Sequence, residues 1–231
     1  RQGADAAVCT HVSNVYGNVL PVSAVAALCR ERGVPLVIDA SQSAGTLPVS
    51  LRGTGAAFIA MPGHKGLYGP QGTGLLLCGA AGEPLLQGGT GSNSLDQSMP
   101  DFLPDRHEAG THNVCGIGGL LAGLRFVRKR RPEELLAGER ALTALAARGL
   151  RQLPGVEVFT GPGQSGVLSF RCRDLDCEEA ASRLAEAGIA VRAGLHCAPM
   201  AHRSGGTLET GTVRVSFSAF NTSAEVRQFL Q

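Results

Sequence analysis

The sequence predicts an α/β protein in which a mostly parallel sheet, in a larger domain, is followed by a smaller α+β domain. Residues 6–39 have the pattern strand, helix, strand. Such a unit of about 30 residues is a βαβ crossover, which makes its two strands parallel. After residue 132, short strands alternate with helices, and the first of these helices fits the outside of a second sheet. We therefore place a boundary near Arg130–Pro132, with residues 1–130 in the larger domain and residues 131–231 in the smaller one.

The strands expected in the larger domain are residues 6–12, 34–39, 57–61 and 74–78. Pro21 opens the helix between the first two strands, and Gly33 ends it. The residues expected on its buried face are Val22, Val25, Leu28 and Cys29. Residues 88–104 lack periodicity and are rich in glycine, serine and asparagine, which is typical of a loop. A long helix is expected at residues 113–130, with a solvated basic cluster at its end, where cations suit the helix dipole.

The smaller domain is expected to begin with a helix that Pro132 opens. Its apolar stripe consists of Leu135, Leu136, Leu142, Leu145, Ala146 and Leu150. Strands are expected at residues 156–160, 167–172, 189–192 and 212–216. A helix is expected at residues 176–187, where Asp176 and Glu179 are arranged like a capping box, and another from residue 222 to the end.

Composition excludes several classes of protein. The chain has 231 residues, of which 43% are hydrophobic, and no apolar run reaches the roughly 20 residues of a membrane span. The net charge of +2 does not point to nucleic acid or to an anionic membrane. The 7 cysteines are odd in number and form no CxxC pair, which argues against a disulfide framework and a structural zinc site. We expect a reducing, cytoplasmic location and no metal.

Asp39 and Lys65 are the most informative pair of residues. Asp39 ends an apolar run at residues 36–39, and Lys65 lies in the glycine-rich stretch 63–74. Ligands of parallel sheets bind beyond the carboxyl ends of the strands, so both side chains are expected at one edge. A carboxylate that keeps a pyridine nitrogen protonated, and a lysine that forms a Schiff base, are what pyridoxal phosphate (PLP) requires. Taken singly, Lys65 could be a solvated loop residue and Asp39 a helix cap.

Three further residues suggest substrate chemistry. Asn14 is an uncharged polar residue after the first strand, or simply a turn residue. Cys197 follows His196 and lies five residues after Arg192. Cations near an exposed cysteine favour the reactive thiolate, although a single cysteine is more often a small buried hydrophobe. Arg214 stands between apolar neighbours in a strand and needs a partner, either a substrate carboxylate or an internal salt bridge.

Six segments together resemble the class V aminotransferase family, and within it the cysteine desulfurases and selenocysteine lyases. They are residues 11–17, 39–42, 63–70, 108–111, 192–197 and 212–218, in the family's order along nearly the whole chain. The resemblance implies the PLP-dependent transferase fold of type I, with residues 1–130 as the C-terminal part of the large domain. Pro62 departs from the family, because many relatives carry serine there, and the family's phosphate-binding loop precedes the matching segments.

The resemblance implies roles for five residues around the cofactor. Lys65 would form the Schiff base and act as the base, Asp39 would pair with the pyridine nitrogen, and Gln42 would bond the ring hydroxyl. His64 would touch the phosphate or the edge of the site. Thr111 would reach the phosphate of the neighbouring subunit, which makes a homodimer part of the active site.

The resemblance also implies the chemistry of the substrate side. Arg214 would bind the carboxylate of L-cysteine, with Arg192 close by, and Asn14 would lie near cofactor or substrate. Cys197 would attack the sulfur and carry it away as a persulfide, so that alanine leaves. The segment around Cys197 is short, as in the group that passes its persulfide to a dedicated acceptor protein. Iron–sulfur cluster assembly and tRNA thiolation are both open as pathways.

Alternative functions differ in what they require. An aminotransferase or an epimerase of class V needs no thiol, so Cys197 argues against both, whereas a selenocysteine lyase is compatible with it. A non-catalytic relative that lacks part of the site is a second alternative. A phosphate or nucleotide binder rests only on Gly72, Thr73 and Gly74, which match neither a P-loop nor the dinucleotide fingerprint.

Overall fold

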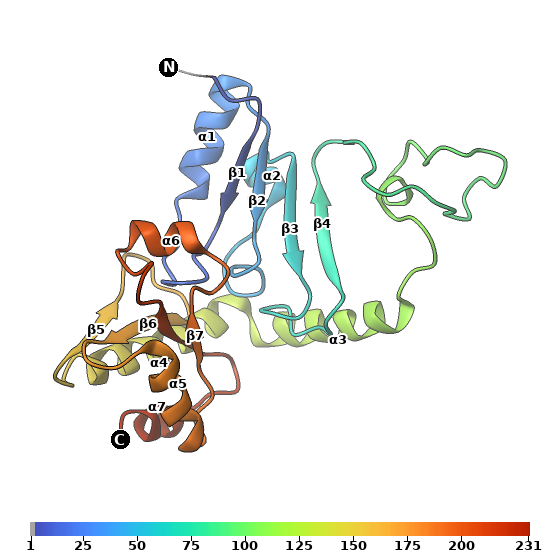
Figure 1. The fold of residues 1–231 in the computed structure, drawn as a ribbon. Coiled ribbons are helices and arrows are strands. Elements are labelled where there is room, and N and C mark those ends of the chain that lie inside the picture. Colours follow the sequence, from blue (N-terminus) through green and yellow to red (C-terminus); the bar gives the residue numbers. More distant parts are fainter. Residues whose placement is uncertain (1–2) are drawn as a thin grey trace.

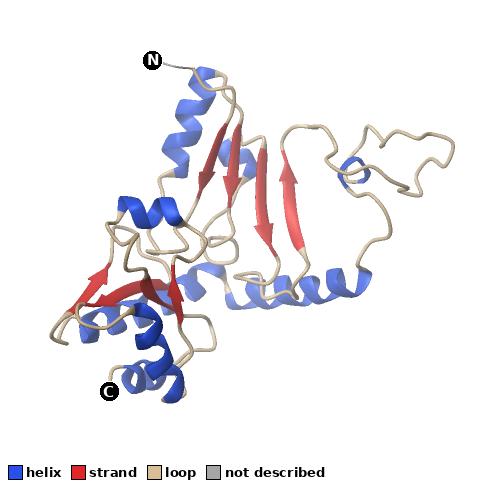
Figure 2. Cartoon of the chain, in the orientation of Figure 1, coloured by secondary structure: helices blue, strands red, loops and turns tan. Residues whose placement is uncertain are grey.

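The computed structural model describes residues 3–231 and contains two sheets of four strands each. The first sheet has the order β1-β2-β3-β4 (Figure 1), and the second has the order β5-β6-β8-β7. Figure 2 shows the strands of both sheets and the helices around them. Two clusters of buried apolar side chains, one around each sheet, form the core. None of the helices in the described part of the chain combines the length and the apolar composition needed to cross a bilayer.

The first sheet is mostly parallel, as the sequence predicts. Strands β1 (Ala7–Thr10), β2 (Leu36–Asp39) and β3 (Phe58–Pro62) are parallel, and β4 (Gly74–Cys78) is antiparallel to β3. Helix α1 (Val22–Arg32) makes the crossover from β1 to β2, and the short α2 (Leu51–Thr54) precedes β3. The carboxyl ends of the three parallel strands therefore meet at one edge, which faces the second sheet in Figure 1.

The buried face of α1 differs from the prediction at one residue. Val22 and Cys29 are buried as expected, but Leu28 is 53% exposed and Ala26 is buried instead. Positions 22, 26 and 29 are spaced by four and three residues, so they form one stripe of a helix, and Leu28 lies beside it. Ala26 thus takes the place in the core that was predicted for Leu28.

The connection between the sheets runs through two helices. After β4, residues 79–113 are irregular except for the 3₁₀ helix η1 (Asp105–His107), so the predicted loop at 88–104 is confirmed. Helices α3 (Val114–Arg130) and α4 (Pro132–Leu150) follow, and the basic residues at the end of α3 are exposed as predicted. Only Arg131, with a positive φ of 68°, separates the two helices.

The second sheet is antiparallel throughout. It comprises β5 (Val156–Phe159), β6 (Val167–Cys172), β7 (Arg192–Gly194) and β8 (Thr212–Ser216), with α5 (Cys177–Glu186), α6 (Pro199–Ser204) and α7 (Ser223–Phe229) between and after them. The strand predicted at 189–192 is wrong in position, because only residues 192–194 pair with β8. Asp176 caps α5 by accepting bonds from Glu178 and Glu179, which is one half of the expected capping box.

Candidate active site

Lys65 lies in a closed loop that begins directly after β3. The Gly63 N–H donates to Thr73 O at 2.7 Å, and the Gly69 N–H donates to Gly63 O at 2.7 Å. Within the loop, the Tyr68 N–H donates to Lys65 O at 2.9 Å. These three bonds fix the backbone around Lys65 while its side chain is exposed. The loop is therefore a rigid base that carries a free amine.

Helix α3 packs directly against the backbone of this loop. Gly123 lies so close to the loop that a Cβ atom there would be 2.2 Å from Leu67 O and 2.7 Å from the Tyr68 carbonyl carbon. No real Cβ atom makes such contacts, so the approach of α3 to the loop requires glycine at this position.

Asp39 and Gln42 follow the neighbouring strand β2. The Asp39 carboxylate is half-buried, and its Oδ1 accepts a bond of 2.9 Å from the Ser41 N–H. Gly45, with a positive φ of 93°, touches Gly66 so closely that a Cβ atom would lie 1.9 Å from its carbonyl oxygen. The segment that carries Gln42 is thereby held against the Lys65 loop.

A cavity of about 460 Å³ lies where the two sheets meet. Four of the predicted residues line it, namely Gln42, His64, Lys65 and Arg214. Three of these come from the edge of the first sheet, and Arg214 comes from β8 of the second sheet. Asp39 is not among the lining residues, although Ser41, which holds its carboxylate, is.

Arg214 is half-buried and connects the two sheets. Its Nη1 donates to Asn14 O at 3.0 Å, and its Nε is buried without a partner in the described residues. Within residues 3–231 it makes no salt bridge, so the alternative of an internal ion pair is not found. Burial lowers its pKa, and so does Arg192, which is its direct partner across β7 and β8. Two arginines are therefore paired across β7 and β8, and Arg214 lines the cavity.

Cys197 lies in the turn between β7 and α6 and is exposed. The Arg192 Nη2 is 3.7 Å from the Cys197 Sγ. The Asn14 Nδ2 donates to His196 O at 2.7 Å, which ties the turn to the segment after β1. Asn14, Arg192, Cys197 and Arg214 thus form one connected group next to the cavity.

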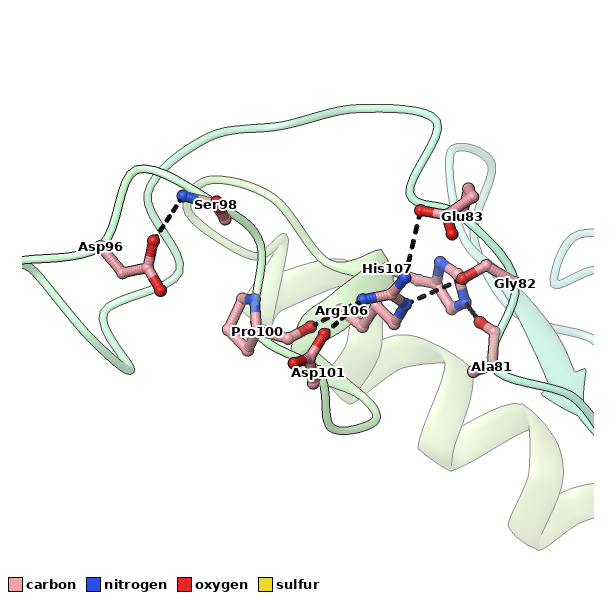
Figure 3. Close-up of polar contacts among 9 residues, drawn as sticks. All are labelled: Ala81, Gly82, Glu83, Asp96, Ser98, Pro100, Asp101, Arg106 and His107. Atoms are coloured by element: carbon pink, nitrogen blue, oxygen red, sulfur yellow. Dashed lines mark hydrogen bonds and ion pairs between the residues drawn. The ribbon is translucent and has the colours of Figure 1, made fainter.

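Thr111 lies apart from the other predicted residues. It is exposed in the segment between η1 and α3, and it does not line the cavity. The loop before it is fixed by Arg106, whose Nε donates to Gly82 O at 2.8 Å and whose Nη1 donates to Asp101 at 2.9 Å (Figure 3). Glu83 also pairs with Arg106 at 3.2 Å. Arg106 thus holds the two ends of the irregular segment before Thr111 together.

Tyr68 and Glu139 are among the cavity residues that were not predicted as part of a site. Tyr68 has a positive φ of 55°, and its hydroxyl accepts a bond of 3.1 Å from the Ala219 N–H, just after β8. Glu139 lines the cavity from α4, and burial raises the pKa of its carboxyl to about 7. Its sequence signal was its position on the apolar stripe of that helix, four residues after Leu135. Nothing in the sequence marks the backbone conformation of Tyr68.

No group of three or more histidine, cysteine, aspartate or glutamate side chains in residues 3–231 is placed to hold a metal ion.

Comparison with known proteins identifies the family. The profile described as aminotransferase class-V matches residues 1–229. A probable cysteine desulfurase from Methanothermobacter thermautotrophicus is 36% identical over 229 residues, which cover 94% of this chain and 57% of the relative. One from Xylella fastidiosa is 35% identical, over 96% of this chain and 54% of the relative. The chain thus spans little more than half the length of these relatives.

Solved structures agree with this assignment. An apo cysteine desulfurase from Thermococcus onnurineus NA1 matches with a TM-score of 0.89 and 33% identity, over 99% of this chain and 58% of that one. The Escherichia coli cysteine desulfurase CsdA matches with a TM-score of 0.88 and 30% identity, over 97% of this chain and 57% of that one. The predicted type I fold of PLP-dependent transferases and the predicted family are both confirmed: the chain belongs to the class V aminotransferase family.

Proposed function

We propose that this chain forms the C-terminal part of a PLP-dependent cysteine desulfurase, which converts L-cysteine to L-alanine and takes up the sulfur on Cys197. The observation that carries the proposal is the exposed Cys197 thiol beside the guanidinium of Arg192, which itself lies across from Arg214. A nucleophilic sulfur and a paired cationic site for a carboxylate are what this reaction requires. The names of the relatives support the same proposal.

The residues at the sheet edge fit PLP. The cavity of about 460 Å³ is large enough for a cofactor and a small amino acid, and the amine of Lys65 reaches it from a rigid loop. Lys65 would hold the aldehyde carbon, Asp39 the pyridine nitrogen, Gln42 the ring hydroxyl and His64 the phosphate side. When bound, PLP supplies an electron sink for the bonds at the substrate's α-carbon.

The chain's own residues then perform distinct tasks. Arg214, whose Nε is buried and unpartnered, binds the substrate carboxylate together with Arg192. The amine of Lys65 takes the proton from the α-carbon. The Cys197 thiolate attacks the substrate sulfur, so that a sulfur–sulfur bond forms while the bond between the sulfur and the substrate's β-carbon breaks. The β-carbon then gains a proton and becomes the methyl group of alanine. Asn14 holds the nucleophile's turn at His196 O.

The same proposal includes the surroundings of the enzyme. Thr111, exposed and remote from the cavity of its own chain, would serve the phosphate of a neighbouring subunit in a homodimer. The exposed persulfide on Cys197 would pass to an acceptor protein. All seven cysteines are unpaired, which suits a reducing, cytoplasmic location.

The test uses the protein expressed with whatever sequence flanks residues 1–231 in its gene. L-Cysteine and a thiol reductant are added, and alanine and sulfide are quantified in the wild type, in Cys197→Ala and in Cys115→Ala. Cys115 is the matched control, because it is also exposed but lies at the start of α3. We expect equal amounts of alanine and sulfide in the wild type and in the control, and neither product in Cys197→Ala.

Two results would redirect the proposal. Undiminished sulfide from Cys197→Ala would remove the nucleophile's role and favour a lyase that needs no protein thiol. A protein that binds the cofactor but does not turn over cysteine would indicate another class V reaction.

A further inference from the structure

A group of buried polar side chains lies directly beneath the turn that carries Cys197. His196 is 3% exposed, and His202, Thr207 and Thr212 are 0% exposed. They come from the Cys197 turn itself, from α6, from the segment after α6 and from the start of β8. Polar groups that are this deeply buried destabilise a fold unless they are bonded, so the group needs a reason to be there.

The turn above them has a costly backbone conformation. His196 and Cys197 have φ values of 51° and 59°, in the left-handed region that side chains disfavour. Such residues cost of order 1–3 kcal/mol each and persist only where their surroundings determine them. The conformation exposes the Cys197 thiol toward Arg192 while it buries the His196 ring. The contacts of the His196 ring therefore bear on where the thiol points.

Those contacts form a continuous chain. The His196 Nε2 lies 3.0 Å from Thr212 Oγ1, and the two histidine rings are 5.5 Å apart. The His202 Nδ1 lies 2.8 Å from Thr207 Oγ1, which is itself 2.6 Å from the hydroxyl of Tyr16. Tyr16 belongs to the connection after β1, two residues from Asn14, so the chain of contacts begins in the other half of the fold.

The charge state of His196 suits this role. Burial, followed by the nearby cations Arg214 and Arg192 and the ring of His202, lowers the pKa of His196 to about 4. The ring is therefore neutral near pH 7, and it can pack against His202 without repulsion. Because the His196 ring is neutral, the positive charge next to the Cys197 thiol comes from Arg192.

We propose that His202 is a positioning residue for Cys197: held by Thr207 and Tyr16, it supports the His196 ring and so fixes the left-handed turn that presents the thiol to Arg192. The inference rests on the proposed role of Cys197 as the nucleophile, and it adds residues that do not touch the substrate. It also predicts that the hydroxyl of Tyr16, in the first half of the fold, affects a thiol in the second half.

The test measures the alkylation of Cys197 by iodoacetamide at pH 7, by peptide mass spectrometry, in the protein expressed with its natural flanking sequence. Asparagine reproduces the Nδ1 position of histidine and glutamine reproduces the Nε2 position. His202→Asn should keep the bond to Thr207 but lacks the ring that packs on His196, so it should slow alkylation less than His202→Gln, which should lose both. We expect the rate in His202→Gln to fall by about fivefold, which corresponds to the net free energy of one neutral hydrogen bond.

The same mass spectra contain a control for unfolding. Cys177 is buried in the small-domain core, so its protection reports that this core is intact. An unchanged Cys197 rate in His202→Gln with Cys177 protected would overturn the proposal, as would equal losses in the asparagine and glutamine variants. If the His202 variants expose Cys177, Tyr16→Phe decides, because it removes only the hydroxyl that contacts Thr207. It should slow alkylation, and an unchanged rate refutes the inference.

Alkylation needs neither cofactor nor turnover. A protein that releases no sulfide but shows the asparagine–glutamine difference would contradict the proposed desulfurase activity and leave the positioning role standing. A protein that releases sulfide but shows no difference between the asparagine and glutamine variants would contradict only the positioning role.

Discussion

The carboxyl group of Glu139 makes the stability of the protein depend on pH in a direction opposite to that of most acidic residues. Glu139 is 8% exposed, lines the cavity from α4 and makes no salt bridge within the described residues. Burial raises its pKa from 4.5 to about 7, because a buried carboxylate loses its hydration. The folded state therefore holds this proton more tightly than the unfolded state does.

The size of the effect follows from the two pKa values. Below pH 4.5 both states are protonated, so the folded state carries no penalty from Glu139. As the pH rises toward 7, the unfolded state ionises first and the folded state loses relative stability, until the loss is complete above the folded pKa. Since one pKa unit is worth about 1.4 kcal/mol, the full loss is about 3 kcal/mol.

The assay is urea unfolding of the wild type and of Glu139→Gln at several pH values between 4 and 8.5. Glutamine has nearly the same shape and cannot ionise, so the difference between the two proteins isolates this carboxyl group. We expect similar midpoints near pH 4, and a variant that is more stable by up to about 3 kcal/mol above pH 8. A difference that does not change with pH would refute the reasoning, because it would mean that Glu139 titrates alike in both states.

Three further predictions concern the loop and the site. Gly123→Ala should destabilise the fold by roughly 1–3 kcal/mol, because the new Cβ atom would collide with Leu67 O. Gly118→Ala is the control in the same helix: a Cβ atom there has nothing within 4 Å, so the substitution should stabilise the fold by up to about 1 kcal/mol. Thermal unfolding of the two variants measures the difference. Lys65→Ala should abolish the cofactor that borohydride traps on the protein, and trapping that survives would exclude Lys65 as the Schiff-base residue. Arg214→Lys should raise the apparent KM for L-cysteine about tenfold or more while the protein still binds cofactor, because lysine cannot make the bidentate contact; an unchanged KM would contradict the carboxylate role.

Several strands of both sheets could be predicted because their signals are local. Residues 74–78, 167–172 and 212–216 form strands with the bounds expected from their apolar and β-branched runs. Lys65 and Arg214 line one cavity, which the family resemblance implied and the local patterns alone did not. Short-range patterns were therefore sufficient for the strands but not for the meeting of these two residues.

The remaining features depend on distant contacts. The strand expected at 189–192 lies at 192–194 because its pairing with β8 sets its position, and its own residues favour no particular register. Leu28 is exposed because it lies beside the stripe of α1 that faces the sheet, and which stripe faces the sheet depends on tertiary packing. The contact between Tyr16 and Thr207 joins residues 191 positions apart, so no local pattern could indicate it.

The pairing of Arg192 with Arg214 is the feature that connects fold and function most directly. Like charges directly opposite each other on neighbouring strands are destabilising, and burial of the Arg214 Nε without a partner adds to the cost. A fold that keeps such a pair needs an anion to offset the repulsion. Under the proposed function, the Cys197 sulfur, 3.7 Å from the Arg192 Nη2, and a substrate carboxylate at Arg214 would supply this negative charge. Arg192 would contact the nucleophile and, together with Arg214, bind the substrate carboxylate. The cross-strand pairing of Arg192 with Arg214 would then relate the position of the thiol to that of the substrate carboxylate.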